Sequence, residues 1–494
     1  MEEKYIVSID QSTQGTKGLL FNSRGELIKR EDKSHEQIVN AEGWVSHNPM
    51  EIYENVLLVV KKLLKGIEKS KVVGLGISNQ RETSLVWDRK TGLPLGNAIV
   101  WQCKRAVEIC EREKIKQNAD KIREKTGMPL SPYFPAAKIA WLLENQQGVS
   151  ELLKKGQLCH GTMDTWLIYK LTGGISYKTD YSNASRTQLF NIFDLSWDEE
   201  ICSLFGIDSK NMPQVCDSDA LYGETDFEGV LPCKIPICGV MGDSHGALFG
   251  QGCISTGMTK ATYGTGSSIM MNIGKYPVLS QSGLVTSLAW KVNGEVSYVL
   301  EGNLNYTGAV ISWLKNDLEL IDSPKETEKL AKEAIKDDSL YLVPAFSGLG
   351  APYWKSDAKA AFVGMTRTSK KREFVRSALE SIAYQITDVL QAMKNDAKTK
   401  LDKLKVDGGP TRNAYLMQFQ GDIADVKVEI PNAEELSGIG VAYLAGLRLG
   451  IWGEEIFERL ERKIYSPQMK KEKRKEKYLG WQKAVQTVIS EDLK

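Results

Sequence analysis

The segment Tyr5-Ile-Val-Ser-Ile-Asp-Gln-Ser-Thr-Gln-Gly-Thr16 decides how this chain is interpreted. Residues 5–9 are mainly apolar and predict a short buried strand that ends at the carboxylate of Asp10. The glycine, serine and threonine residues that follow predict a tight turn whose N–H groups and hydroxyls converge, which is an arrangement that binds anions. A plain hairpin turn has the same signature. Asp10 favours the functional interpretation, because a carboxylate at a buried strand end needs compensation, and a hydrated Mg²⁺ supplies it.

A second segment, Thr262-Tyr-Gly-Thr-Gly-Ser-Ser268, repeats this composition in the other half of the chain. Two facing anion loops, one from each domain, would hold a triphosphate in a cleft between them. Neither segment is a Walker loop, since no Gly-x-x-x-x-Gly-Lys-[Ser/Thr] pattern follows a strand. We expect the domain boundary at the glycine-rich step Phe249-Gly250, which gives an N-terminal domain of residues 1–249 and a C-terminal domain of residues 250–494.

Length and composition exclude several classes of protein. The chain has 494 residues, which is enough for two domains that each bury a core. A formal net charge of +1 leaves no electrostatic footprint for nucleic acid or an acidic membrane surface. The sequence shows neither an apolar run of membrane-spanning length nor a signal-peptide pattern. We therefore expect a cytoplasmic protein without nucleic-acid or membrane partners.

Cysteine and histidine usage argues against a disulfide frame or a zinc site. The eight cysteines include no Cys-x-x-Cys pair, and there are only four histidines. Strand-like and helix-like segments alternate along the chain, which predicts an α/β fold. Residues 72–78, 235–241 and 403–406 read as buried strands, and each is followed by polar residues.

The first polar group follows the strand at residues 72–78. Arg81 and Glu82 form either an exposed ion pair or a pair that grips hydroxyl groups, with arginine donating and glutamate accepting. Trp101 and Tyr133 are either core aromatics or the walls of a polyol pocket. Both interpretations stay open on these residues alone.

Asp243, in Met-Gly-Asp-Ser-His-Gly, follows the strand at residues 235–241 and precedes a helix. It could be a helix N-cap, a general base that accepts a substrate hydroxyl proton during phosphoryl transfer, or both. His245 beside it is expected to be a satisfied structural residue. Residues 407–413 (Asp-Gly-Gly-Pro-Thr-Arg-Asn) form a turn before another helix, where glycines would let a nucleotide approach the helix N-terminus.

Together these segments resemble the FGGY family of carbohydrate kinases, and within it the glycerol kinases. The resemblance is collinear from Tyr5 to about Ala484. Besides the segments already quoted, it rests on residues 43–51, 78–83, 97–103, 161–168, 179–187, 348–354 and 406–409. It implies two ribonuclease-H-like domains of the actin and hexokinase type with a cleft between them. It also implies phosphorylation of a polyol by ATP with Mg²⁺.

Roles carried over by matching position divide into four groups. Asp10 would face the metal, and Asp243 would be the catalytic base. The acceptor would be bound by Arg81, Glu82, Trp101, Tyr133, Asp243, Ser244 and Ser268. The nucleotide would be bound by Thr13, Gln14, Gly15, Lys17, Thr265, Gly308, Ser312, Gly409 and Asn413.

Several positions depart from the usual glycerol kinase pattern. Ser12 and Lys17 replace glycine and arginine in the phosphate loop, and Ser312 replaces a nucleotide-contacting glutamine. Ser244 and Ser268 replace a glutamine and a phenylalanine in the acceptor pocket. Both of these changes remove bulk and leave hydroxyls, which would admit a longer acceptor.

The expected function is phosphorylation of a terminal hydroxyl of a small polyol, glycerol first. A longer polyol or ketose of the erythritol, ribulose or xylulose type remains an alternative. An actin-like ATPase without a small acceptor is a further alternative, although such a protein has no reason to carry the acceptor set. Some members of the family that this chain resembles carry a regulatory phosphohistidine. The matching segment here, residues 221–236, contains no histidine, so regulation by phosphorylation of that segment is not expected. We further expect a homo-oligomer, a dimer or a tetramer.

Overall fold

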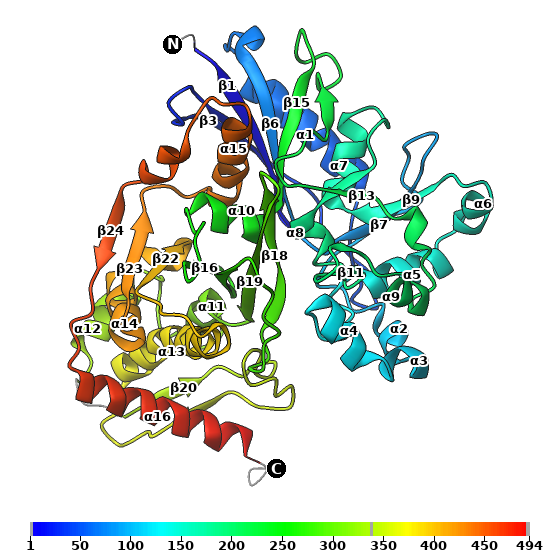
Figure 1. Ribbon diagram of the computed structural model, residues 1–494. Coiled ribbons are helices and arrows are strands. Elements are labelled where there is room, and N and C mark those ends of the chain that lie inside the picture. Colours follow the sequence, from blue (N-terminus) through cyan, green and yellow to red (C-terminus); the bar gives the residue numbers. More distant parts are fainter. Residues whose placement is uncertain (1–2, 336–338, 491–494) are drawn as a thin grey trace.

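Two mixed β-sheets, one from each half of the chain, form the framework of the molecule (Figure 1). The computed structural model describes residues 3–335 and 339–490. The first sheet has six strands. In spatial order these are β14 (Gly223–Thr225), β15 (Ile235–Gly242), β6 (Val72–Asn79), β1 (Tyr5–Gln11), β2 (Gly15–Phe21) and β3 (Leu27–Ser34).

The second sheet repeats the arrangement of the first around its own central strand. It has seven strands. In spatial order these are β18 (Val285–Val292), β19 (Glu295–Leu304), β17 (Ser267–Gly274), β16 (Thr259–Tyr263), β22 (Lys403–Asp407), β23 (Lys427–Pro431) and β24 (Arg462–Tyr465). In each sheet the central strand, β1 or β16, pairs antiparallel with the next strand and parallel with a later one.

The parallel pairing explains why polar residues meet at one edge of each sheet. Asp10 of β1 is in register with Ser78 of β6, and Thr262 of β16 is in register with Asp407 of β22. Carboxyl ends of parallel strands face the same side, so each central strand delivers its final residues beside its neighbour's. Both anion segments predicted from the sequence are the connections of antiparallel hairpins, β1–β2 and β16–β17.

Two helices lie between the sheets and join them. The helix α10 (Asp243–Gly250) follows β15 directly, and α15 (Leu436–Arg448) comes from the second half of the chain but packs on β1, β6 and β15 of the first sheet. They touch through glycines: a Cβ atom added at Gly440 would lie 1.9 Å from the carbonyl oxygen of Gly246. A shared apolar cluster includes Ile6 and Leu19 from the first sheet, Met270 and Val299 from the second, and much of α15.

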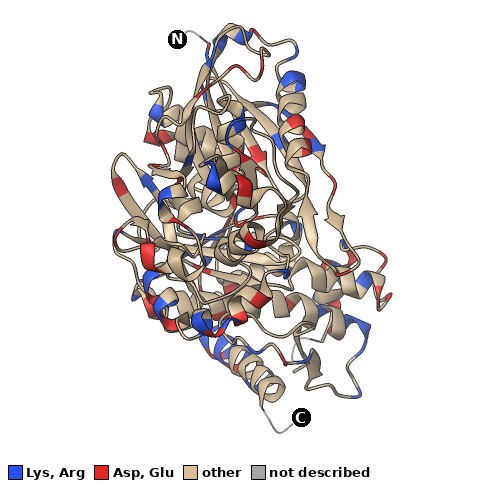
Figure 2. Ribbon diagram, turned by 90° about the vertical axis from the view of Figure 1, so that its right-hand side faces the viewer, with Lys and Arg blue, Asp and Glu red and all other residues tan. Residues whose placement is uncertain are grey.

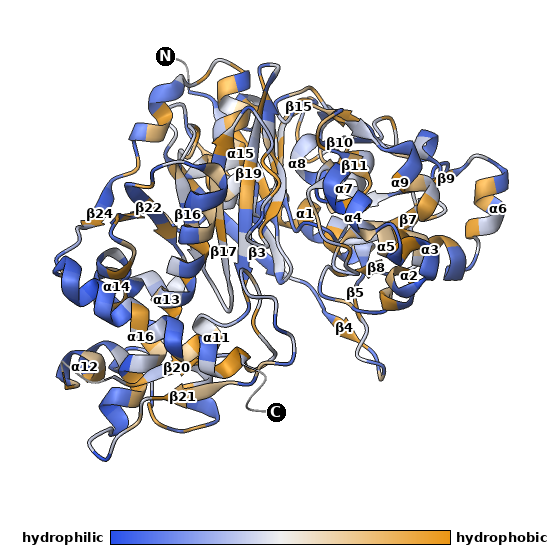
Figure 3. Ribbon diagram, turned by 60° about the horizontal axis from the view of Figure 1, so that its bottom comes forward, coloured by the Kyte–Doolittle hydropathy of each residue, from blue (hydrophilic) through white to orange (hydrophobic). Residues whose placement is uncertain are grey.

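The remaining helices cover the outer faces of the sheets. Near the first sheet are α1 (Pro49–Leu63) and α7 (Met163–Leu171), whereas the short α8 (Tyr181–Ala184) contacts both β15 of the first sheet and β18 of the second. Around the second are α11 (Gly308–Asn316), α12 (Glu326–Glu333), α13 (Lys371–Ala397), α14 (Ala414–Ala424) and α16 (Lys471–Ile489). The side chain of Asn48 caps α1 by accepting from the amides of Met50 and Glu51. Hydrophobic residues mark the central strands, whereas β3 at the edge is hydrophilic (Figure 3).

A further group of elements is inserted into the first half and lies to the right in Figure 1. Its sheet contains β4 (Ile38–Val39), β5 (Val45–His47), β8 (Ala98–Ile99), β7 (Ser84–Asp88) and β9 (Leu158–Thr162). Its helices are α2 (Val107–Glu111), α3 (Glu113–Lys116), α4 (Ala119–Thr126), α5 (Pro135–Asn145), α6 (Val149–Lys154) and α9 (Glu199–Leu204). Short strand pairs complete the fold: β10 (Lys178–Asp180) with β13 (Gln214–Cys216), β11 (Phe190–Asn191) with β12 (Ser196–Trp197), and β20 (Tyr341–Val343) with β21 (Ala361–Val363).

Charges of both signs are interspersed over the molecule (Figure 2). All eight cysteines are free. None of the helices within residues 3–335 and 339–490 is both long and apolar enough to cross a membrane. The step Phe249-Gly250 falls at the last two residues of α10. The helix expected after residues 407–413 is α14, which begins at Ala414 after a 3₁₀ turn over Gly409–Arg412.

Candidate active site

A cavity of about 630 Å³ lies between the two sheets, beside the turns of the β1–β2 and β16–β17 hairpins. It brings together all of the predicted acceptor residues and three predicted nucleotide residues. The lining includes Arg81, Glu82, Trp101, Tyr133, Asp243, Ser244 and Ser268, together with Thr13, Gln14 and Thr265. Several lining residues had no assigned part: Gln37, Gln102, Asn303, Leu304 and Asn305.

Arg81 and Glu82 project from a strained turn at the end of β6. Glu82 has a φ of +61°, and the N–H of Thr83 donates to the carbonyl oxygen of Arg81 at 2.8 Å. This bond closes a γ-turn of the rare form in which the central residue has positive φ. A non-glycine residue in this region costs on the order of 1–3 kcal/mol, so the surroundings must hold it there.

A buried network of charges surrounds this turn. Arg81 donates to both oxygens of Glu301 at 2.9 and 2.8 Å, and Arg186 Nε donates to Glu82 Oε1 at 2.6 Å. Arg186 Nη1 also lies 2.8 Å from Glu301 Oε2, as an ion pair without hydrogen-bond alignment. Burial opposes the charge of Glu301, but the two guanidinium groups outweigh it and hold its pKa well below the usual range.

Asp243 occupies the first position of α10, and Gly242 is the N-cap residue. The Oδ1 atom of Asp243 lies 3.2 Å from Arg81 Nε and accepts from the Ser244 amide at 2.6 Å. The Asp243 side chain is 34% exposed and Arg81 only 6%, so the carboxylate reaches the cavity while its cationic partner is buried. Gly242 is required here, because a Cβ atom would lie 2.6 Å from Arg81 Cγ.

His245 differs from the expectation of a satisfied structural residue. It is buried beside Gly242, and neither of its ring nitrogens has a hydrogen-bond partner among the described residues. Burial, with the nearby Arg81 charge, lowers the pKa of His245 well below its usual value. The ring is therefore neutral at physiological pH.

Trp101 and Tyr133 form one wall of the cavity. Their rings lie 5.6 Å apart, and Trp101 Nε1 donates to Thr13 Oγ1 of the first hairpin at 3.0 Å. Lys138, on α5 and fully buried, donates from Nζ to the carbonyl oxygens of Pro132 and Tyr133. Burial lowers the pKa of Lys138 to about 7.

Asp10 lies buried below the first hairpin. Its Oδ1 accepts from Ser78 Oγ at 3.0 Å, and Lys17 Nζ lies 4.0 Å from Oδ2. Burial raises the pKa of Asp10 to about 6, although the Lys17 charge opposes the rise. Lys17 itself pairs at 2.7 Å with Glu435, the residue before α15, and neither Asp10 nor Lys17 lines the cavity.

The second hairpin places Ser268 above a buried lysine. Lys260 Nζ lies 3.0 Å from Thr262 Oγ1 and 3.4 Å from Ser268 Oγ. Ser268 Oγ also lies 3.4 Å from Glu301 Oε1. Burial lowers the pKa of Lys260, although the nearby Asp407 charge opposes the shift. The end of the pocket formed by Ser268 is therefore polar.

The other predicted nucleotide residues lie outside the cavity lining. Gly409 lines a separate cavity of about 530 Å³ with Gly408 and Thr411. Ser312 is exposed on α11 and donates to the carbonyl oxygen of Gly308 at 3.4 Å. Asn413 caps α14 through Leu416 N and donates to Thr327. Gly15 and Gly308 are needed for close backbone contacts, with Lys33 and Gly264 respectively.

Four buried charged residues beside the site were not predicted from the sequence: Glu301, Arg186, Lys138 and Lys260. A signal existed for Glu301, the only carboxylate in the buried part of β19, because such a group requires buried cationic partners. Arg186 belongs to a segment that carried the family resemblance, but it received no part in the site. Nothing in the local sequence distinguishes Lys138 from a surface lysine of an amphipathic helix.

Comparison with protein families decides the classification. The model of the N-terminal domain of the FGGY family of carbohydrate kinases matches residues 5–250, and that of its C-terminal domain matches residues 259–449. The chain belongs to the FGGY family of carbohydrate kinases. The resemblance seen in the sequence and the expected two-domain fold of the actin and hexokinase type are both confirmed. This FGGY kinase is an enzyme that transfers a phosphoryl group from ATP to an alcohol group.

Individual relatives match this FGGY kinase along its whole length. It is 47% identical to glycerol kinase 1 of Thermotoga maritima, over 99% of this chain and 100% of that protein. It is 44% identical to the glycerol kinase of Bacillus subtilis, over 99% of both chains. Among solved structures it is similar to Plasmodium falciparum glycerol kinase with ADP, with a TM-score of 0.93, 36% identity and 99% coverage of both chains.

Proposed function

We propose that this FGGY kinase transfers the terminal phosphoryl group of ATP to a terminal hydroxyl of glycerol, giving glycerol 3-phosphate. The observation that carries the proposal is the juxtaposition of Asp243 with the Arg81–Glu82 pair and the Trp101–Tyr133 wall in one cavity. The full-length similarity to proteins named glycerol kinase supports glycerol as the acceptor.

In the proposed mechanism each residue has one task. Arg81 donates to acceptor hydroxyls, Glu82 accepts from them, and the two aromatic rings pack against the carbon chain. Asp243 accepts the proton of the attacking hydroxyl, since its partly exposed carboxylate lines the cavity. The amides of the two hairpins orient the phosphates, and closure of the cleft excludes water.

A divalent metal fits the buried carboxylate of Asp10. Its charge is only partly offset by Ser78 and by Lys17 at 4.0 Å, which suits a hydrated Mg²⁺ that keeps most of its water ligands. Asp10 would hold that metal, whose charge offsets the negative charge of the transferring phosphoryl group. Within the described residues no group of three His, Cys, Asp or Glu side chains could hold a metal ion, so phosphates would supply the other ligands.

The first prediction tests Asp243. Asp243→Asn should lower turnover at least about a hundredfold with an unchanged thermal midpoint, because the amide cannot accept the hydroxyl proton. Glu199→Gln, which changes an exposed carboxylate at the first position of α9, is the matched control and should keep full activity. Near-normal turnover of folded Asp243→Asn would overturn the assignment of the base.

A longer polyol or ketose is a second candidate acceptor, favoured by the hydroxyls of Ser244 and Ser268 on the cavity lining. ADP release measured with glycerol, erythritol, erythrulose, ribitol, ribulose, xylulose and dihydroxyacetone distinguishes the two. A strong preference for glycerol supports the main proposal, and a preference for any longer acceptor replaces it.

We also propose that the two domains divide between residues 249 and 250. We further propose that the protein is cytosolic, and its eight free cysteines support this. The expected homo-oligomer stays a prediction.

A further inference from the structure

We propose that Glu301 and Arg186 are positioning residues of the acceptor site, which hold the Arg81–Glu82 turn in its binding conformation. Neither lines the cavity, so each would act through the residue it contacts. The inference rests on the proposed function, because it needs Arg81 and Glu82 to be the groups that bind acceptor hydroxyls.

The contacts form a chain of alternating charge, which the peptide bond between Arg81 and Glu82 closes into a ring. Glu301 binds Arg81 through both oxygens, Arg186 binds Glu82, and Arg186 also pairs with Glu301. Arginine presents its donors in a rigid planar fork, so a two-point contact fixes the direction of the whole guanidinium plane. Arg81 therefore has one orientation, with Nε left to face Asp243 at 3.2 Å.

Glu301, which anchors the ring, belongs to the second sheet. Glu301 lies within β19, between Met270 of β17 and Val285 of β18, and its side chain is fully buried. Arg81 belongs to the first half of the chain, so this contact crosses between the domains. The orientation of Arg81 is thus set by the second domain.

The strained turn explains why such support is needed. Glu82 at φ +61° lies in a conformation that the backbone alone disfavours. The ion pair of its carboxylate with Arg186 opposes relaxation of the turn, and relaxation would redirect both acceptor-binding side chains at once. A displacement of about 1 Å in such a group is enough to lower catalytic efficiency about a hundredfold.

Glu301→Gln tests the proposal directly. The amide cannot accept from both arms of Arg81, so the KM for glycerol should rise at least about tenfold while the KM for ATP stays within about twofold. Glu380→Gln is the matched control, because Glu380 on α13 is equally a buried glutamate bound to Tyr415 and Lys477. Its effect should be confined to the thermal midpoint.

Selectivity among acceptors gives a readout that loss of stability would not move. The wild-type protein should prefer glycerol over propane-1,2-diol, which lacks one hydroxyl, and this preference should shrink in Glu301→Gln. Arg186→Lys keeps the positive charge but lacks the planar guanidinium group, and it should reduce the preference for glycerol as well. The double variant should be no worse than the more impaired single variant, because both residues act on one turn.

Each failure has a distinct signature. If wild type phosphorylates no polyol, the proposed function fails. If wild type is active and folded Glu301→Gln keeps its glycerol KM and selectivity, the positioning assignment is overturned. Should Glu301→Gln fail to fold, Glu301→Asp retains the charge one methylene shorter, and an unchanged glycerol KM in that variant would equally overturn the assignment.

Discussion

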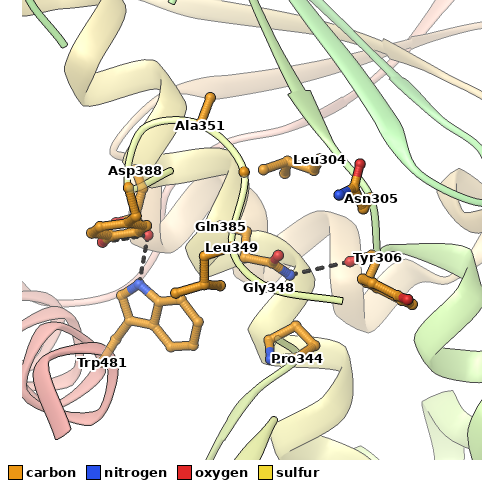
Figure 4. Close-up of a pocket in the computed structure, with 12 residues that line it drawn as sticks. Leu304, Asn305, Tyr306, Pro344, Gly348, Leu349, Ala351, Gln385, Asp388 and Trp481 are labelled. Atoms are coloured by element: carbon orange, nitrogen blue, oxygen red, sulfur yellow. Dashed lines mark hydrogen bonds between the residues drawn. The ribbon is translucent and has the colours of Figure 1, made fainter. Parts of the chain in front are cut away.

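Asp388 is a buried carboxylate whose hydrogen-bond donors are neutral side chains. Three neutral groups donate to it: Tyr353 Oη at 3.0 Å, Tyr478 Oη at 2.6 Å and Trp481 Nε1 at 2.8 Å. Figure 4 shows the contact of Asp388 with Trp481. Burial raises its pKa to about 6, whereas the arginine-bound Glu301 has a lowered pKa. The two groups differ in partner charge, which decides the sign of the shift.

Asp388 should make stability depend on pH. Its pKa is higher in the folded state than in the unfolded state, so its stabilising contribution is complete below about pH 4 and is lost as the pH rises through about 6. The loss is on the order of 3 kcal/mol. Unfolding of Asp388→Asn by urea at pH 4 to 7 should lack this part of the decline, while exposed Asp402→Asn should follow wild type. Parallel curves for wild type and Asp388→Asn would contradict the assignment.

At the scale of elements, the α10–α15 contact sets the place of the proposed base. The two helices approach through Gly246, Gly250 and Gly440, where a Cβ atom would meet backbone atoms of the opposite helix. Asp243 begins α10, so the close approach of α15 determines where the carboxylate lies relative to the cavity.

Gly440→Ala should therefore be costly. The added methyl group would lie 1.9 Å from a backbone oxygen, and the resulting overpacking should destabilise the protein by on the order of 3 kcal/mol. Gly421→Ala, within α14, would place its methyl group 3.2 Å from the carbonyl oxygen of Val426, a much smaller overlap, and should cost less than Gly440→Ala. Thermal midpoints of the two variants measure the difference, and equal midpoints would show that the helices separate freely.

Most individual elements could be predicted from the sequence, because their signals are local. The strands predicted at residues 5–9, 72–78 and 235–241 correspond to β1, β6 and β15, because each is a short apolar run that ends at polar residues. The ring around Glu301 could not be predicted, since its members are separated by as many as 220 positions. The pairing of Lys17 with Glu435 has the same cause: it depends on where α15 packs, which no local pattern reveals.

At the scale of the whole molecule, the halves are not independent. The helix α15 comes from the second half but covers the first sheet, and one apolar cluster contains residues of both sheets. Trp452 Nε1 also donates to the carbonyl oxygen of Ser23, which links the C-terminal part of the chain to the first sheet.

The full chain should consequently unfold in one transition. Loss of α15 would expose the apolar face that it covers on the first sheet, so the core that the two halves share could not form in either half alone. Urea curves followed by tryptophan fluorescence and by far-ultraviolet circular dichroism should coincide. Two separated transitions, or curves with different midpoints, would show that the sheets are stable separately.

The contact between Arg81 and Glu301 constrains how such enzymes can be recombined. A chimaera that takes residues 1–249 from one parent and the remainder from another inherits Arg81, Glu82 and Arg186 from the first and Glu301 from the second. If the second parent has a neutral residue at that position, the chimaera carries a buried guanidinium without its counter-charge. Exchange of halves is therefore tolerated only between parents that share this set. With Arg81 and Glu82 in the proposed acceptor-binding role, acceptor preference would depend on both halves of the chain.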